Sequence, residues 1–137
     1  MATIAPDGHP RLVPICFVLA GEPSVLYTPI DNKPKRDDDP LALARVRDIA
    51  ADSRVTILVD HWDEDWTRLA WLRAEGRATL LEPGAGHREH SAAVAALRAK
   101  YSQYETHRLE QRPLTRITIE RVISWGSLEP GPTSRLP

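Results

Sequence analysis

The run 69–81 is the feature of this sequence that most constrains the fold, because it predicts one long β-strand. Gly76 interrupts the run and predicts a bulge or a bend there. Two further segments have strand character, since Val55–Val59 is β-branched and apolar and Arg116–Ile123 alternates with a period of two. The chain is therefore predicted to be built mainly from β-structure.

Shorter strands are predicted before residue 30. Arg11–Leu19 and Val25–Thr28 have strand character, and Asp7-Gly8 is a turn signal. Pro14 lacks a backbone N–H, so it predicts an edge, a bulge or a gap in the ladder. We expect these segments to form an antiparallel meander.

Two helices are predicted between the strands. Asp39 and Pro40 suit the N-cap and first position of a helix that runs to about Ala51. A second helix of about 15 residues follows residues 84–86. Its apolar face is predicted to comprise Val94, Leu97, Tyr101 and Tyr104.

The order of these elements predicts a mainly β (α+β) fold in which antiparallel connections dominate and the helices plug a barrel. A chain of 137 residues is long enough for one well-buried domain, which we place at residues 1–128. Residues 129–137 are rich in Pro, Gly and Ser and are predicted to form a loosely held tail.

Composition excludes several classes of protein. A net charge of −1 argues against a nucleic-acid binder, which would have a broad basic face. No apolar stretch is long enough to span a membrane, and no signal-peptide pattern opens the chain. The single cysteine, Cys16, cannot form an internal disulfide, which favours a reducing cytoplasm.

Two kinds of catalytic site find little support. No histidine lies in a nucleophile elbow, and Cys16 lies in an apolar run typical of a packed thiol. The acidic loop 61–65 and the pair His87 and His90 match no specific metal signature, so no metal is predicted. We assign no residue to proton transfer.

Four tryptophans are more than a core of this size requires. Trp66 lies in a polar loop, where contact with a ligand or a second subunit is the favoured interpretation. Trp71 lies within the long strand and is interpreted as a core residue.

The segment after Val25–Thr28 is a candidate anion site. Lys33, Lys35 and Arg36 can donate charge-assisted hydrogen bonds to phosphate or carboxylate, and Tyr27 and Thr28 could add hydroxyl donors. Backbone groups of Val13-Pro14-Ile15 could line the edge of a ring. The alternative is that the three cations form only a solvated basic loop.

This ordered set of segments resembles the pyridoxamine-phosphate-oxidase-like superfamily of flavin and deazaflavin split β-barrel proteins. Within it, the sequence is most similar to actinobacterial probable enzymes that use the deazaflavin coenzyme F(420). The resemblance covers nearly the whole chain to Trp125-Gly126, and no single motif is diagnostic. It rests on residues 7–15, 26–28, 33–36, 54–61, 63–66 and 73–78.

The resemblance implies a homodimeric split barrel of six to eight antiparallel strands, with two cofactor sites in grooves between the subunits. Only six residues precede Asp7, where related chains usually have a short helix and a full first strand. The implied chemistry is hydride transfer at the ring of F(420), with FMN as the alternative cofactor and a small conjugated molecule as substrate. A non-catalytic cofactor carrier and an interaction domain without a cofactor stay open.

The resemblance also implies which residues form the site. The ring would lie along Val13, Pro14 and Ile15. The phosphate or anionic tail would meet Tyr27, Thr28, Lys33, Lys35 and Arg36. Trp66 and Arg68, at the start of the long strand, would come near the site.

Overall fold

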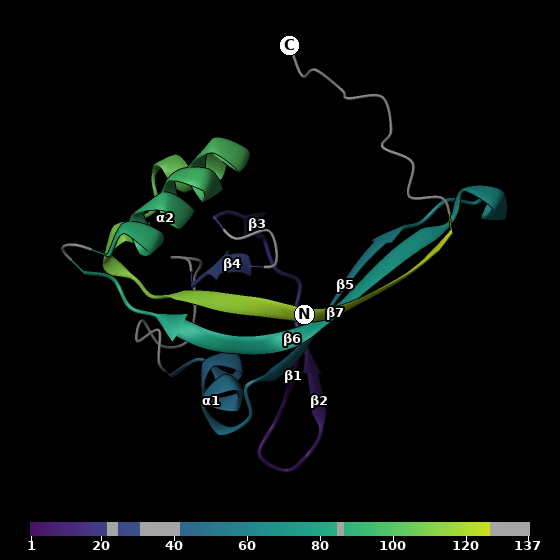
Figure 1. The fold of residues 1–137 in the computed structure, drawn as a ribbon, viewed down its shortest axis with the longest axis horizontal. Coiled ribbons are helices and arrows are strands. Elements are labelled where there is room, and N and C mark those ends of the chain that lie inside the picture. Colours follow the sequence, from purple (N-terminus) through teal and green to yellow (C-terminus); the bar gives the residue numbers. More distant parts are fainter. Residues whose placement is uncertain (22–24, 31–41, 85–86, 127–137) are drawn as a thin grey trace.

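The computed structural model describes residues 1–21, 25–30, 42–84 and 87–126. These residues form one antiparallel sheet of seven strands, in the order β2-β1-β5-β6-β7-β4-β3, and two α-helices (Figure 1). The elements are β1 (Ala2–Ile4), β2 (Pro10–Leu12), β3 (Val18–Leu19), β4 (Val25–Pro29), α1 (Ala44–Ala51), β5 (Arg54–His61), β6 (Ala70–Leu81), α2 (Arg88–Lys100) and β7 (Leu114–Gly126). The prediction of a mainly β, six- to eight-stranded antiparallel fold with short helices is confirmed.

The two edges of the sheet are joined by a short connection, which requires the sheet to curl. β2 and β3 are the outermost strands, and only residues 13–17 separate them along the chain. Six extended residue steps span roughly 20 Å, whereas the edges of a flat seven-stranded sheet lie roughly 29 Å apart. The sheet is therefore curved toward a barrel, and residues 13–17 cross its opening.

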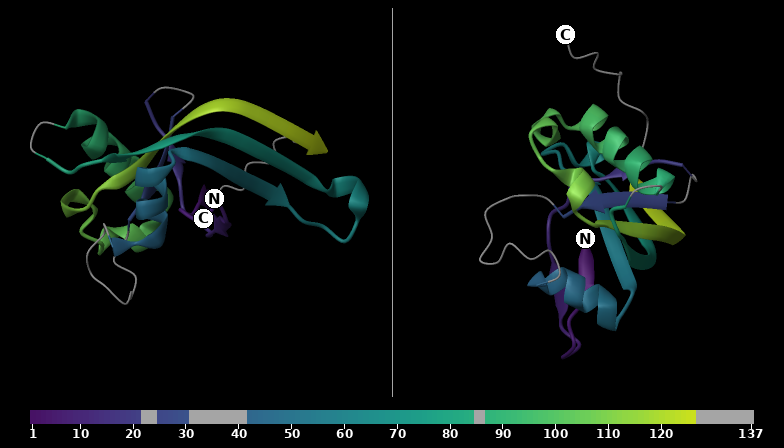
Figure 2. Two further views of the ribbon diagram at one scale, coloured as in Figure 1. Left: turned by 90° about the horizontal axis from the view of Figure 1, so that it is seen from below. Right: turned by 90° about the vertical axis from the view of Figure 1, so that its left-hand side faces the viewer.

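The long strands β5, β6 and β7 have an inner half in the barrel and an outer half beyond it. Figure 2 shows the outer halves sweeping away from both helices as a curved, three-stranded arm. Burial changes in the same place, since Val55 and Ile57 of β5 are buried whereas Leu58 and Val59 are 59% and 42% exposed. We call the outer halves of β5, β6 and β7 the arm.

A β-bulge marks the boundary between the barrel and the arm. The register of β6 and β7 shifts between Glu75 and Gly76, so that Glu120 has no partner across the ladder. A Cβ atom on Gly76 would lie 2.2 Å from the carbonyl oxygen of Thr118. The bulge predicted at Gly76 is confirmed, and glycine is required because the neighbouring backbone comes so close.

Two apolar clusters form the core. One lies between α2 and the strands β3, β4 and β7, and its residues Val94, Leu97 and Tyr104 confirm most of the predicted apolar face of the second helix. The other lies inside the curved sheet, where Ile49 of α1 packs with β4, β5, β6 and β7. The charges of α2 favour its dipole, with Glu89 in the first turn and Lys100 in the last.

The amino-terminal strands depart from the prediction. A hairpin forms at the expected Asp7-Gly8 turn, where Gly8 has a φ of 84°. The single strand predicted over Arg11–Leu19 is wrong, because the chain forms β2 with β1 and then β3 with β4. Pro14 lies in the connection between them, which confirms the predicted gap in the ladder.

Some predicted features lie outside the described residues. They are the helix start at Asp39 and Pro40, the cations Lys33, Lys35 and Arg36, and the tail 129–137. The described part of the first helix ends at Ala51, as predicted. Neither helix in the described part of the chain is long and apolar enough to cross a membrane.

Candidate functional site

The arm presents aromatic and apolar side chains in register on one face. Trp71 is paired with Asp60 on one side and with Trp125 on the other, so the three residues form one row across β5, β6 and β7. In the next row on the same face, Arg73 is paired with Leu58. Cross-strand partners point to the same side of a sheet, and these residues therefore share one surface.

This face lines a hollow of about 600 Å³, which we call the arm hollow. Its apolar wall is unusually exposed, since Trp62 is 72%, Leu12 77% and Trp125 53% accessible. Such a contiguous apolar surface is typical of a site that binds a ligand or another protein. The hollow is lined by Met1, Ala2, Leu12, Thr56, Leu58, Asp60, His61, Trp62, Leu69, Ala70, Trp71, Arg73 and Trp125.

The interpretation of Trp71 as a core residue is wrong. Its side chain is half-buried and belongs to the arm hollow rather than to either apolar cluster. The period of two along β6, which places Trp71 and Arg73 on one face, was the sequence signal for this arrangement. Pairing with Trp125 depends on the register with β7, which the sequence does not specify.

The predicted ring wall adjoins this hollow. The Val13 N–H donates to the Met1 carbonyl at 3.0 Å, and the Met1 amino group donates to the Val13 carbonyl at 2.8 Å. Met1 in turn lines the hollow. Both backbone groups of Val13 are therefore bonded to Met1, and Pro14 has no N–H to donate. The assignment of this segment to the ring stays a prediction. Ile15 is half-buried.

The hydroxyl groups predicted to face an anion lie inside the protein. Tyr27 is 3% exposed, and its hydroxyl donates a hydrogen bond of 2.6 Å to Oε1 of Glu89 on α2. Nε of Arg116 donates to the same oxygen at 2.7 Å. Thr28 is 1% exposed. Both side chains are thus buried in this chain, and their assignment to an anion site stays a prediction.

This arrangement shifts the pKa of both partners. Burial, followed by the hydrogen bond to Glu89 and its charge, raises the pKa of Tyr27 to about 12. The hydrogen bonds from Tyr27 and Arg116 hold the pKa of Glu89 below its ordinary value. The contacts among Tyr27, Glu89 and Arg116 connect β4 and β7 to α2, and their role is structural.

Trp66 and Arg68 lie at the tip of the arm. They belong to a 3₁₀ turn between β5 and β6, where the Asp65 carboxylate accepts hydrogen bonds from the Thr67 N–H at 3.0 Å and hydroxyl at 2.7 Å. Trp66 is 77% exposed, and Arg68 forms an ion pair of 3.3 Å with Asp63. Figure 1 shows this tip far along the arm from β2, so one chain does not bring these residues to the ring wall.

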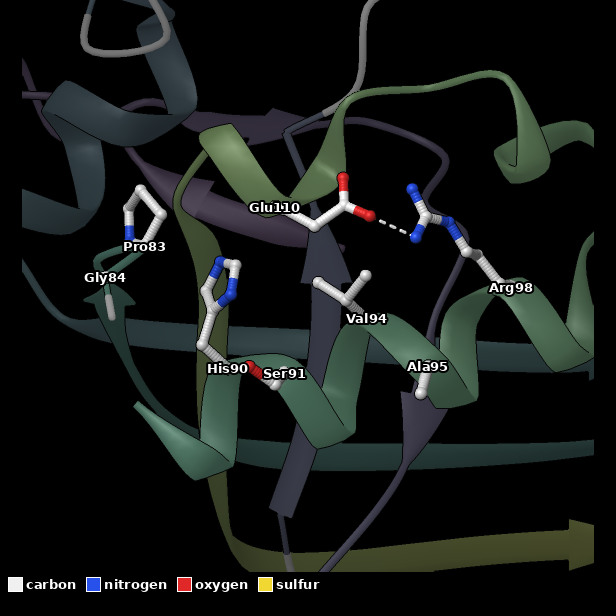
Figure 3. Close-up of a pocket in the computed structure, with 8 residues that line it drawn as sticks. All are labelled: Pro83, Gly84, His90, Ser91, Val94, Ala95, Arg98 and Glu110. Atoms are coloured by element: carbon white, nitrogen blue, oxygen red, sulfur yellow. Dashed lines mark hydrogen bonds and ion pairs between the residues drawn. The ribbon is translucent and has the colours of Figure 1, made fainter. Parts of the chain in front are cut away.

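A second cavity, of about 530 Å³, lies beside α2 (Figure 3). Its lining includes His90, which is 3% exposed and whose Nε2 lies 2.9 Å from the Arg112 carbonyl oxygen. Arg98, facing Glu110 in Figure 3, pairs with that carboxylate and donates to the carbonyls of Tyr104 and His107. These polar groups hold the segment after α2 in place and form no evident binding site. The described residues contain no cluster of three or more His, Cys, Asp or Glu able to hold a metal.

A curved antiparallel sheet whose edge strands are joined across an opening, with an exposed three-stranded arm, defines the class of split β-barrel proteins. Within that class, the family model described as pyridoxamine 5'-phosphate oxidase matches residues 1–126. The chain therefore belongs to the pyridoxamine 5'-phosphate oxidase family. A comparison with curated protein sequences finds no match.

Solved structures share this fold at low sequence identity. A FAD-binding protein from Mesorhizobium loti is 22% identical, with a TM-score of 0.59 over 90% of this chain and 79% of that chain. The heme storage protein HutZ from Vibrio cholerae is 14% identical, with a TM-score of 0.64 over 89% of this chain and 81% of that one. A heme binding protein from Mycobacterium smegmatis is 18% identical, with a TM-score of 0.67 over 94% of this chain and 48% of that one.

Proposed function

We propose that the protein is a cofactor-dependent oxidoreductase that binds a flavin-type ring, either F(420) or FMN, and acts on a small conjugated substrate. The observation that carries this proposal is membership of the pyridoxamine 5'-phosphate oxidase family over residues 1–126. The FAD-binding relative from Mesorhizobium loti supports a flavin-type ligand. When bound, the ring supplies hydride transfer, and the protein supplies orientation and electrostatics.

The arm hollow fits a planar ring. Trp71 and Trp125 offer flat apolar surface side by side, and the volume of about 600 Å³ lies within the range of small-molecule sites. Arg73 on the same face forms an ion pair of 3.1 Å with Glu75, and its guanidinium could turn toward a polar ring edge. In this arrangement the tryptophans orient the ring and exclude water from one of its faces.

The basic loop would hold the anionic part of the cofactor. Lys33, Lys35 and Arg36 suit the long anionic tail of F(420), and the same groups could hold the single phosphate of FMN. We therefore place F(420) first and FMN second. Replacing Lys33 and Lys35 together with alanine should weaken binding by roughly 1.5–3 kcal/mol per lost charged hydrogen bond.

A second copy of the chain would complete the site. The exposed apolar residues of the arm and of the connection at its tip are Leu58, Val59, Trp62, Trp66, Val122 and Trp125. So much apolar surface on one element is costly in water, and a homodimer would cover it. Trp66 and Arg68 would then approach the site from the other subunit. Sedimentation should give a dimer at micromolar concentration, and a clean monomer would contradict this arrangement.

Haem is a second candidate ligand, because two of the structural relatives are a heme storage and a heme binding protein. The arm hollow is large and apolar and has His61 in its lining as a possible axial ligand. A protein that stores or carries its ligand without catalysis is the corresponding alternative function. The cytoplasm, with its reduced thiols, suits either ligand and the single cysteine.

One titration separates these functions. Purified protein is titrated with F(420), FMN, FAD and haem, and tryptophan quenching is followed alongside ligand fluorescence or absorbance. Binding of F(420) or FMN at micromolar concentration supports the oxidoreductase proposal, and Trp125→Leu should then weaken it. Leu19→Ser is the control, because Leu19 is 58% exposed but lies outside the arm hollow. Binding of haem alone, with the flavins inert, would refute the proposal in favour of haem.

A further inference from the structure

The segment that crosses the barrel opening has unusual backbone bonding. Residues 13–17 leave β2 at one edge of the sheet and reach β3 at the other, so they pair with neither edge as a strand. Backbone N–H and C=O groups that lose ladder partners need others. At one end, Val13 obtains both of its bonds from Met1. At the other end, Phe17 obtains them from side chains.

The carboxyl end of α2 supplies those side chains. The Phe17 N–H donates to the Tyr101 hydroxyl oxygen at 3.2 Å, and the same hydroxyl donates to the Phe17 carbonyl at 3.1 Å. A hydroxyl group can accept one bond and donate another at the same time. Nζ of Lys100 donates a further bond of 2.9 Å to the Phe17 carbonyl. We call Lys100 and Tyr101 the clamp.

The clamp also fixes the Phe17 ring. Nζ of Lys100 lies 4.3 Å from the centroid of that ring and 5.2 Å from that of Tyr101, which are cation–π distances. Phe17 lines an apolar hollow of about 380 Å³ together with Leu26 and Ile57. The position of Phe17 therefore sets both the course of the crossing segment and one wall of that apolar hollow.

We propose that Lys100 and Tyr101 are positioning residues for the cofactor site. They fix the Phe17 end of residues 13–17, and Met1, which lines the arm hollow, fixes the Val13 end, so the segment is tied to that hollow at one end and to the clamp at the other. This inference rests on the proposed function, since it takes the arm hollow as the ring site. Neither residue touches the ring itself.

The clamp can be released with little damage to the core. Lys100 is exposed, and α2 is anchored by other residues, such as Val94 and Leu97. Tyr101 is half-buried and packs edge-on against Tyr104 with ring centroids 5.7 Å apart. Tyr101→Phe keeps this packing and removes only the hydroxyl, and Lys100→Met keeps the aliphatic stem.

The test compares Tyr101→Phe, Lys100→Met and the double variant with Lys100→Arg, which retains the cation. Arg88→Met is the matched control, because it removes a cation at the other end of α2. Hydrogen exchange at the Phe17 amide measures the clamp directly, and titration with FMN and F(420) measures the site. The absorption spectrum of the bound ring reports its surroundings, which a purely structural defect in α2 would not change.

We expect the double variant to exchange the Phe17 amide roughly tenfold faster and to bind the cofactor roughly five- to tenfold more weakly, with a shifted ring spectrum. Lys100→Arg should keep most of the wild-type affinity, and Arg88→Met should leave the affinity unchanged. Unchanged exchange at Phe17 would refute the clamp. Faster exchange with unchanged affinity would refute positioning and leave a structural contact. If the wild-type protein bound neither FMN nor F(420), the proposed function would be refuted and the positioning role with it. Hydrogen exchange at Phe17 would still test whether the clamp holds the segment.

Discussion

Replacing Tyr27 with phenylalanine isolates the buried contact between β4 and α2. Tyr27→Phe removes the hydroxyl that donates to Glu89 at 2.6 Å and leaves the ring in its apolar cluster. A hydrogen bond to a charged group contributes about 1.5–3 kcal/mol. The Glu89 side chain is 45% exposed and keeps its bond from Arg116, so water can replace part of the lost interaction. We therefore expect a loss of about 1.5 kcal/mol near pH 8, at the lower end of that range.

The effect of this substitution should depend on pH. In the unfolded chain Tyr27 loses its proton near its ordinary pKa of 10.0, whereas in the folded protein the pKa is about 12. The stabilisation linked to this proton is thus fully present below pH 10 and is lost as the pH rises to about 12. Two pKa units correspond to at most about 2.7 kcal/mol, and less where water reaches the pair.

The assay is urea unfolding of both proteins at several pH values between 8 and 12, followed by circular dichroism. The wild-type protein should be the more stable at pH 8, and its advantage should shrink and can reverse above pH 10. Glu89→Gln is a useful companion, because it keeps an acceptor oxygen but removes the charge that helps to raise the pKa. Parallel stability curves for wild type and Tyr27→Phe across pH 10–12 would refute the reasoning.

Two further predictions concern the bulge and the amino-terminal hairpin. Gly76→Ala should destabilise the fold by about 3 kcal/mol in urea unfolding, because its Cβ would lie 2.2 Å from the Thr118 backbone oxygen. Gly8→Ala, at a positive φ but with open space around it, should cost only about 1–2 kcal/mol, and equal losses would show that the close approach is unimportant. Asp48 is 2% exposed and accepts from the Thr3 hydroxyl at 2.8 Å while it pairs with Arg11 at 3.1 Å. Arg11→Ala should therefore cost about 3–5 kcal/mol and speed hydrogen exchange in β1, because it leaves the buried Asp48 carboxylate without its cation. Asp48→Ala should cost about 1–3 kcal/mol, because it leaves the Thr3 hydroxyl unpaired while the half-exposed Arg11 can turn to water, and slow exchange in both variants would contradict this account.

Local patterns in the sequence were sufficient for the main elements. The β-branched run in β5, the alternation in β7 and the glycine in β6 each act through neighbouring residues, so they predicted two strands and a bulge correctly. The strand over Arg11–Leu19 was wrong because its two halves pair with different partners, at opposite edges of the sheet. That choice depends on contacts between residues distant in sequence.

The candidate site was harder to predict for the same reason. Whether Tyr27 can donate a hydrogen bond to a bound anion depends on where its hydroxyl points, and in this fold that hydroxyl donates to Glu89 of α2. The pairing of Trp71 with Trp125 depends on the register of two strands about fifty residues apart in sequence. Sequence patterns located the aromatic residues but could not show that they meet on one face.

The bulge next to Gly76 separates two roles of the same three strands. On its barrel side, Ala78 of β6 and Ile117 of β7 are buried at 1% exposure, and changes there act on folding. On its arm side, Val122 and Trp125 of β7 are each 53% exposed, so substitutions there remove little core packing. Loss of binding at unchanged stability is therefore expected for substitutions on the arm side of β7, and loss of both for those on its barrel side. If β7 variants on both sides of Glu120 lost stability to the same extent, the arm, too, would be needed for folding.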